Sequence, residues 1–273
     1  RFTNYSDDYF PHADAYRGYL ADYAEAQHLN IRYSTPVTSV SRRAAGRRRS
    51  GFTVSTIGGR EVDCAHVVIA TGLSKPHLPD IGGIELAIGY EDMPIDPLFY
   101  RNKSVLILGK QQSAFETANH IYGETAHVMM VSRGRPRLAW ETHYVGDLRA
   151  INSQYLDAYQ LKSMDTVIDS DLSRFGPFYR RSDGKIALAN ADGDQELFRT
   201  DDPEVFAFWD VVLRCTGWEM DQSIFADDTK PATTHHGKYP AMSGGFESSV
   251  PGLWIAGTLM HGNDWRESSG GFI

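Results

Sequence analysis

Cysteine is scarce in this chain, which has only two among 273 residues, Cys64 and Cys215. Their separation rules out a C-x-x-C redox pair, and they do not form a zinc-binding set. Each lies in or beside an apolar, strand-like segment, where a buried and unreactive thiol is the expected state. The chain therefore carries no redox-active dithiol of its own.

Long apolar runs are missing as well. No stretch approaches the roughly 18 apolar residues of a membrane-spanning helix, and no signal-peptide pattern opens the chain. The first residue is Arg1 rather than Met, and Ile273 follows shortly after Ser268-Ser269-Gly270-Gly271, which is typical of a helix start. We expect that both ends are cut and that no transmembrane segment lies within the chain.

Positive charge is in deficit. The 27 Lys and Arg residues face 35 Asp and Glu, a formal net charge of −8, which disfavours the broad basic surface that nucleic-acid binding requires. The only basic run, between residues 42 and 49, is interpreted as a solvated hairpin loop. The adjacent His235-His236 lacks the spacing of metal ligands on one helix face. We expect neither a nucleic-acid partner nor a metal site.

Apolar residues make up 41% of the chain, enough for one or two buried cores. In the first hundred residues, their spacing predicts a docking helix over 13–29 with one face packed inward. Strands are predicted over 31–41, 52–57 and 61–70. The last two meet at Gly58-Gly59, a hairpin dipeptide, and the three together form a small antiparallel β-meander.

The central region changes character. The apolar strand Ser104–Leu108, a helix over 112–122 and a strand over 126–131 make a βαβ unit. Further predicted elements are a helix over 147–168, a hairpin turned at Asp183-Gly184 between 178–181 and 185–189, and apolar strands over 208–215 and 253–256. The expected fold is α/β, with a sheet buried on both faces.

Two strand ends echo each other, because Ala70-Thr71-Gly72 and Cys215-Thr216-Gly217 lie on either side of the βαβ unit. Residues 76–97 form a loop rich in Pro and Gly that is typical of a crossing between domains. The two Thr-Gly ends therefore bracket an inserted domain. We predict one domain made of residues 1–98 and 218–273, and a Rossmann-like insert over 99–217.

The turn after Leu108 has the character of a dinucleotide site. A helix N-terminus offers unpaired N–H groups to a pyrophosphate, and Gly109 lets the turn close without a Cβ clash. Against the pattern G-x-G-x-x-G, the chain has Gln111 at the second glycine position and the small Ala114 at the third. Since a side chain at the second position obstructs approach to phosphate, two interpretations stay open: nucleotide binding, or a fold retained without its cofactor.

Two further strand ends carry candidate ligand contacts. Arg133 follows the strand over 126–131, at the place where an Arg suits the 2′-phosphate of NADPH and an acidic residue would bind the ribose of NADH. An ordinary surface Arg is the alternative. Gly257-Thr258 follows the strand over 253–256 and would bring backbone N–H groups near a polar ligand, unless it is only a strand-turn-helix corner.

Several runs together resemble known flavoproteins. The similarity to the flavin-containing monooxygenase superfamily rests on Tyr19-Leu20-Ala21-Asp22-Tyr23-Ala24, Ala70-Thr71-Gly72, the Gly109 turn with Ser113-Ala114-Phe115-Glu116, and Cys215-Thr216-Gly217. Longer runs over 142–152, 159–163 and 256–262 resemble a family of FAD-dependent oxidoreductases of the endoplasmic reticulum. The resemblance implies an α/β flavoprotein with two dinucleotide-binding domains, FAD/NAD(P)-binding and Rossmann-like, whose N-terminal FAD βα unit is missing from the chain.

That family implies cofactors, compartment and partners. The flavoprotein would hold noncovalent FAD, use NADPH and work in the endoplasmic-reticulum lumen, in the ER-associated degradation of misfolded glycoproteins. Its partners would be the adaptors and lectins of that process, with misfolded glycoproteins as clients. The N-x-S sequons at Asn4 and Asn102 are compatible with a glycosylated luminal protein.

The resemblance also assigns cofactor contacts by position. Thr71 and Gly72 would lie near the flavin, and Gly257 and Thr258 would line the returning strand of the FAD-binding domain. The residues that would face NADPH are Gly109, Gln112, Ser113 and Arg133. Ala114 completes the turn motif, and Thr216 with Gly217 completes the second Thr-Gly strand end, so these three are further cofactor-binding candidates. No residue is assigned as a catalytic acid or base.

We therefore predict an FAD-dependent, NADPH-using oxidoreductase whose flavin would reduce O₂ or a disulfide-type acceptor. One alternative is a flavoprotein-fold interaction module in protein quality control with little or no turnover, which Gln111 favours. A flavin-dependent monooxygenase is the second alternative.

Overall fold

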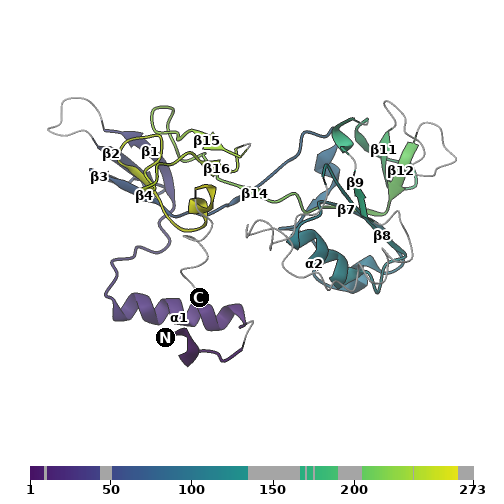
Figure 1. The fold of residues 1–273 in the computed structure, drawn as a ribbon, viewed down its shortest axis with the longest axis horizontal. Coiled ribbons are helices and arrows are strands. Elements are labelled where there is room, and N and C mark those ends of the chain that lie inside the picture. The colour runs from purple at the N-terminus through teal and green to yellow at the C-terminus, as the bar shows by residue number, and fades with distance from the viewer. Residues whose placement is uncertain are drawn as a thin grey trace.

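The chain forms two lobes joined by a narrow connection (Figure 1). The computed structural model describes residues 1–8, 11–43, 51–134, 167–169, 171–174, 176–189, 205–235 and 237–263. The first lobe is built from both ends of the chain, and the second lobe is built from its middle. This arrangement is what an inserted domain produces.

A parallel sheet organises the second lobe. Its five strands, in spatial order, are β6 (Ile88–Gly89), β13 (Val211–Arg214), β7 (Ser104–Leu108), β8 (His127–Ser132) and β9 (Val167–Asp169). The helix α2 (Gln112–Ile121) connects β7 to the parallel strand β8, which confirms the predicted βαβ unit. The sheet is buried on both faces, as its continuous apolar strands indicate.

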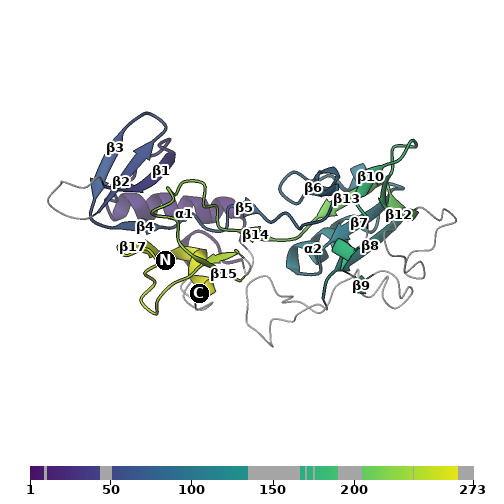
Figure 2. The same cartoon turned by 90° about the horizontal axis from the view of Figure 1, so that it is seen from above.

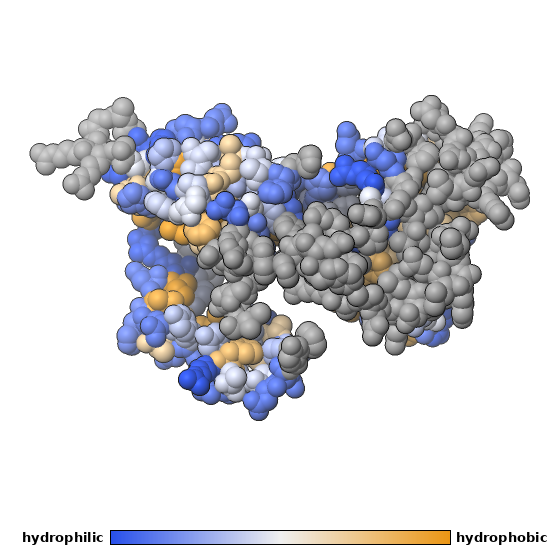
Figure 3. All heavy atoms as spheres, viewed as in Figure 1, coloured by the Kyte–Doolittle hydropathy of each residue, from blue (hydrophilic) through white to orange (hydrophobic). Residues whose placement is uncertain are grey.

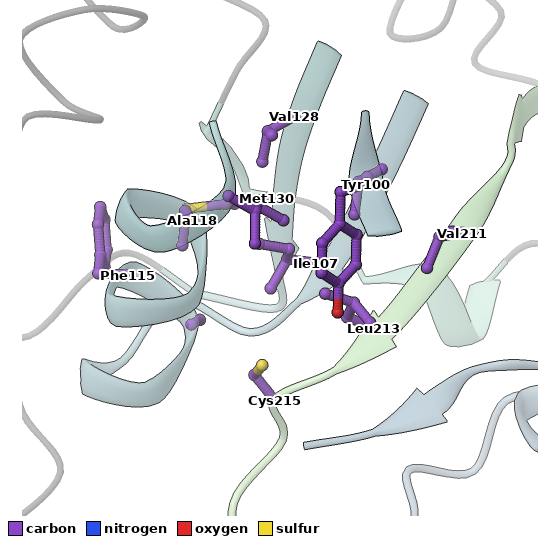
Figure 4. Packing of buried hydrophobic residues seen from close by; sticks show 12 residues of the cluster. Tyr100, Ile107, Phe115, Ala118, Val128, Met130, Val211, Leu213 and Cys215 are labelled. Carbon is purple, nitrogen blue, oxygen red and sulfur yellow. The ribbon is translucent and has the colours of Figure 1, made fainter. Parts of the chain in front are cut away.

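Each face of this sheet has its own core. On one face, Ala118 of α2 lies on the side of the helix that faces Met130 and Ile107 (Figure 4), and Phe115 and Ile121 belong to the same buried cluster. The other face is covered by a three-stranded antiparallel sheet of β10 (Phe178–Arg180), β11 (Ile186–Ala189) and β12 (Val205–Trp209). The turn at Asp183-Gly184 joins β10 to β11, so the predicted hairpin is confirmed. The lobe therefore has three layers.

Two predictions for this lobe were wrong. The predicted strand over 208–215 is two strands in different sheets, because the chain turns at Asp210. The Asp210 carboxylate accepts a hydrogen bond from the backbone N–H of Ser104 at 2.8 Å and lies 3.2 Å from the Lys185 ammonium. Residues 167 and 168 belong to β9 rather than to the predicted helix over 147–168. The rest of that helix lies outside the described residues.

The first lobe contains the predicted meander of β1 (Val37–Arg42), β2 (Phe52–Thr56) and β3 (Glu61–Cys64), with its tight turn at Gly58-Gly59. Residues 31–36, predicted as the start of the first strand, are irregular. The predicted strand over 61–70 is also wrong as one element. Its second half is β4 (Val67–Ile69), which leaves the meander and pairs in parallel with β17 (Leu253–Ile255).

One apolar cluster holds these pieces together, with Phe52 from the meander, Ile69 from β4 and Leu253 from β17 all at most 5% exposed. The remaining short elements of the two lobes are η1 (Phe2–Asn4), η2 (Ile84–Leu86), η3 (Pro97–Tyr100), η5 (Leu172–Arg174), η6 (Gly257–Gly262), β15 (Thr233–Thr234) and β16 (Tyr239–Pro240). None of the described helices is long and apolar enough to cross a membrane.

The predicted N-terminal helix is α1 (Ala13–Ala26), but its expected inward face is not buried. Among its residues, all of them described, none is buried. Tyr16 and Tyr19 pack edge-on against the ring of Phe2, at centroid distances of 5.9 and 5.6 Å. Apolar residues lie at the surface of α1 and on the nearby side of the first lobe (Figure 3), and Leu20 is 44% exposed.

The lobes are connected by an antiparallel ribbon of two short strands, β5 (Lys75–Pro76) and β14 (Trp218–Glu219). These strands lie side by side between the lobes (Figure 2). The chain thus passes from the first lobe to the second and back through one narrow place. β6, at residues 88–89, already pairs within the second-lobe sheet, and the predicted boundaries after residues 98 and 217 stay predictions.

Candidate functional site

The carboxyl ends of β4 and β17 form one candidate site. These strands run in parallel with Ile69 opposite Ile255, so the residues that follow them meet at the same edge. Gly72 and Gly257 have φ angles of 69° and 73°, which favour glycine. A Cβ added to Gly72 would lie 3.2 Å from Oγ1 of Thr258. The fold therefore brings together two pairs predicted from distant parts of the sequence.

This edge is open to solvent. Thr71, Gly257 and Thr258 are exposed, and Gly72 is half-buried. The N–H of Ala256 donates to the carbonyl oxygen of Ile69 at 2.8 Å, which holds the two turns in register. Two hydroxyls and two turns without side-chain obstruction are thus available to a polar ligand.

The second candidate site is the turn at the carboxyl end of β7. The N–H of Gly109 donates to the carbonyl oxygen of Val131 at 2.7 Å, and φ of Gly109 is 130°. A Cβ at Gly109 would collide with the carbonyl oxygen of Cys215. The turn is therefore held between β8 and β13, and only glycine fits at its first position.

The start of α2 completes this turn. Gln111 is the N-cap residue, and its side chain makes no capping hydrogen bond to the helix. Ala114 is 0% exposed, so a small residue is needed at the third position of the glycine pattern. Gln112 and Ser113 are half-buried in the first turn, and Gln112 donates to the Glu116 carboxylate at 2.7 Å.

Arg133 lies at the same edge. It is exposed and directly follows β8, whose Val131 pairs with Leu108 immediately before the glycine turn. Its guanidinium is thus available to an anion next to the turn.

Thr216 and Gly217 follow β13 at the carboxyl edge of the sheet, where they contact the chain that leaves the first lobe. The hydroxyl of Thr216 donates to the carbonyl oxygen of His77 at 2.7 Å, and the carbonyl oxygen of Gly217 accepts from the N–H of His77 at 2.9 Å. Gly217 has a φ of 88°. Both residues fasten the returning chain to the outgoing chain, and their assignment to a cofactor stays a prediction.

One charged residue of the turn was missed by sequence reasoning. Lys110, between Gly109 and Gln111, is 2% exposed, and desolvation lowers its pKa to about 8. A lone Lys directly after an apolar strand and a glycine was the available signal. The turn therefore carries a buried amine whose charge depends on pH near neutrality.

A charged cluster on the ribbon was also missed. The Glu219 carboxylate lies 2.8 Å from the Lys75 ammonium and 3.1 Å from Nδ1 of His77. Desolvation acts to raise the pKa of Glu219, but the hydrogen bonds from Lys75 and His77 outweigh it and lower the pKa. Because His77 and Glu219 are 142 residues apart, only the folded chain reveals their contact.

Arg214 forms a further polar group at the sheet edge. Its side chain is 10% exposed and lies 3.0 Å from the Glu91 carboxylate, which sits over Gly89 where a side chain would collide with it. A cavity of about 390 Å³ opens beside this pair, lined in part by Leu78 and Ile88. The cavity lies beside Gly89 and Arg214, at the carboxyl ends of β6 and β13.

The two cysteines differ in burial. Neither is in a disulfide, and Cys215 is 4% exposed with a pKa that burial raises to about 11. The predicted buried thiol is therefore confirmed for Cys215, whereas Cys64 is only half-buried. Among the described residues, no three His, Cys, Asp or Glu side chains are grouped to hold a metal ion. His236 lies outside the described residues.

Two lobes with glycine turns at the carboxyl ends of parallel strands define a class, the flavoproteins with two dinucleotide-binding domains. A flavin-containing monooxygenase from Stenotrophomonas maltophilia has this fold, with a TM-score of 0.67 over 94% of this chain and 72% of its own at 19% identity. Thioredoxin reductase from T. acidophilum gives a TM-score of 0.60 over 97% and 78% of the two chains at 18% identity. The predicted fold class is confirmed.

The sequence comparison gives the family. Residues 3–257 match the family described as pyridine nucleotide-disulphide oxidoreductase, and the chain belongs to it. Over its whole length the chain is 39% identical to a mouse protein named FAD-dependent oxidoreductase domain-containing protein 2. This similarity confirms the resemblance found in the sequence. The chain spans 43% of that relative's length.

Proposed function

We propose that this chain is the cofactor-handling part of an FAD-dependent oxidoreductase that takes electrons from NADPH. The observation that carries the proposal is the pair of strand edges, one in each lobe, where glycines of positive φ clear the approach to the backbone. The family match supports the oxidoreductase class. When bound, FAD would supply the redox chemistry, because it can accept a hydride from NADPH and pass the two electrons to an acceptor.

The residues of the first lobe fit the flavin nucleotide. Gly72 leaves room beside Thr258 that a side chain would fill, so main-chain N–H groups can approach a phosphate or a ring. The exposed hydroxyls of Thr71 and Thr258 add donors at the same edge. These residues would bind and orient the cofactor without taking part in bond making.

The residues of the second lobe fit NADPH. The N-terminus of α2, which the Gln111 side chain does not cap, lies at the end of β7, and the backbone N–H groups and dipole of such a helix end stabilise a pyrophosphate. Arg133 supplies an exposed positive charge for the 2′-phosphate. Lys110, when protonated, adds a second positive charge within the turn. The three features together favour a phosphorylated dinucleotide.

The compartment and partners are proposed from the sequence resemblance. We propose action in the endoplasmic-reticulum lumen, in the ER-associated degradation of misfolded glycoproteins, together with the adaptors and lectins of that process. What supports this placement is the resemblance of residues 142–152, 159–163 and 256–262 to that family. The sequon residues Asn4 and Asn102 are both exposed, so each is accessible to a glycan.

An interaction module without turnover is the second candidate. It is favoured by Gln111 at the second glycine position and by the buried Cys215, which cannot relay electrons as a thiolate. Under this candidate, flavin would be retained as a structural cofactor.

Anaerobic addition of NADPH to the whole purified protein tests the proposal through flavin absorbance at about 450 nm. Bound flavin that bleaches supports the oxidoreductase. Bound flavin that stays oxidised favours the interaction module, and a protein without flavin overturns the proposal.

Arg133→Leu should raise the NADPH concentration needed to bleach the flavin and leave the NADH concentration unaffected. Arg101→Leu is the matched control, because Arg101 is exposed, pairs with Glu124 and precedes β7 at the opposite end of the sheet.

A further inference from the structure

Gln111 occupies the position in the glycine turn where the dinucleotide pattern has its second glycine. Its backbone is extended, with φ −111° and ψ −170°, and its carbonyl oxygen accepts the first hydrogen bond of α2, from the N–H of Phe115 at 3.1 Å. The main chain of Gln111 is therefore fixed as the N-cap. What its side chain does is a separate question.

The side-chain carbonyl oxygen of Gln111 is buried, and it has no hydrogen-bond partner within the described residues. The side chain does not turn back to cap α2 either. Burying an amide oxygen without a donor costs free energy, because its hydrogen bonds to water are lost and not replaced. Such an atom needs an explanation.

Two other glutamine side chains within the described part of the chain do not share this feature. Gln112 donates to the Glu116 carboxylate at 2.7 Å, and Gln222 donates to the carbonyl oxygen of Pro231 at 2.9 Å. Both are ordinary structural contacts. Gln111 differs in place as well, since it stands at the edge where Arg133 and the N-terminus of α2 would face a nucleotide.

The missing partner must be a hydrogen-bond donor. Pyrophosphate oxygens only accept, so they cannot satisfy the oxygen of Gln111, although they can accept from the amide nitrogen of the same side chain. A dinucleotide carries donors beside its pyrophosphate in the hydroxyls of its sugars. A ribose hydroxyl thus matches the unmet oxygen while the phosphate matches the amide nitrogen.

We propose, building on the proposed function, that Gln111 is a nucleotide-binding residue whose side-chain oxygen accepts a hydrogen bond from a ribose hydroxyl of NADPH. The side chain of Gln111 then binds the dinucleotide at the place where a glycine would let the backbone come close to the phosphate. The departure from the glycine pattern then marks a different way of holding the dinucleotide rather than a lost site.

The test is equilibrium binding of NADPH to the whole oxidised protein, followed by tryptophan fluorescence, for the wild type, Gln111→Leu and Gln111→Gly. Gln111→Leu should weaken binding at least about tenfold, because it removes the hydrogen bond from the ribose hydroxyl together with the contact of the amide nitrogen with phosphate. Its melting temperature without nucleotide should not fall, because the substitution removes a buried oxygen that had no partner. Gln222→Leu is the matched control and should show the reverse, with a lower melting temperature and unchanged NADPH binding.

Gln111→Gly distinguishes recognition from obstruction. If the side chain obstructs the phosphate, the glycine variant binds NADPH more tightly than the wild type, and the proposal is overturned. Unchanged binding by Gln111→Leu overturns it as well. A wild-type protein that holds flavin and binds no NADPH at all would instead refute the proposed function, and this inference with it.

Discussion

Replacing Gly109 by alanine tests whether the glycine turn is held as tightly as its contacts indicate. Two costs add at this position. A side chain at a φ of 130° lies in a region that residues other than glycine rarely adopt, which costs about 1–3 kcal/mol. The new Cβ would also collide with the carbonyl oxygen of Cys215, and such overpacking costs about 1–3 kcal/mol.

The expected loss is therefore about 2–6 kcal/mol, a large part of the roughly 5–15 kcal/mol by which a domain is stable. We expect Gly109→Ala to lower the urea midpoint strongly and to weaken NADPH binding, because β13 must move away from β7. Urea unfolding of the whole protein, followed by tryptophan fluorescence, measures the first effect. Fluorescence titration with NADPH measures the second.

Two other glycines separate the contributions. Gly59 has a φ of 73° but open space around an added Cβ, so Gly59→Ala should cost only about 1–2 kcal/mol. Gly58 has open space and no positive φ, so Gly58→Ala should change the stability by less than about 0.5 kcal/mol. If Gly109→Ala unfolds at the same urea concentration as Gly59→Ala, the close contact with β13 does not constrain the turn, and the reasoning fails.

Three further predictions concern ionisable groups. The pKa of Lys110 is about 8 in the folded protein and about 10.5 when unfolded, so the free energy of unfolding should rise with pH between these values, by up to about 3 kcal/mol. Lys110→Met should abolish this rise, measured as the urea midpoint against pH. A variant whose urea midpoint rises with pH as in the wild type would contradict the prediction. The lowered pKa of Glu219 predicts that Glu219→Gln costs about 1 kcal/mol at pH 7, because the pairs with Lys75 and His77 are partly exposed, and that this difference vanishes as the pH falls through the folded-state pKa. A difference that persists in acid would show that the pairs do not cause it. With a pKa of about 11 and 4% exposure, Cys215 should resist a maleimide at neutral pH until urea is added; rapid labelling of the native protein, detected by mass spectrometry, would disprove its burial.

Local patterns were sufficient for the elements that depend on near neighbours in the chain. The βαβ unit was predicted to within one residue at each end, because a short apolar strand, a glycine turn and a helical period are all short-range signals. The hairpins at Gly58-Gly59 and Asp183-Gly184 are of the same kind. The division of the chain into a domain of two parts and an insert over 99–217, inferred from the two Thr-Gly strand ends, stays a prediction.

Where apolar runs pass from one sheet to another, the sequence did not show the break. Residues 61–70 and 208–215 read as single strands, yet each divides between two sheets, because no Gly or Pro marks the bend at residues 65–66 or at Asp210. For α1 the predicted burial of one face was wrong for a different reason. Apolar residues at helical spacing predict a buried face, but they do not show which other element would cover it.

The sequence by itself determined the elements that depend on near neighbours, such as the βαβ unit and the two hairpins, together with the fold class and the family, since these rest on residue spacing and turn chemistry. Only the tertiary structure decided which distant residues meet. It placed Gly72 against Thr258, Gly109 against Cys215 and His77 against Glu219, and it left the oxygen of Gln111 buried without a partner among the residues that the structure describes. Pairings across more than a hundred residues depend on how sheets stack and where strands end, and no local pattern in the chain encodes them.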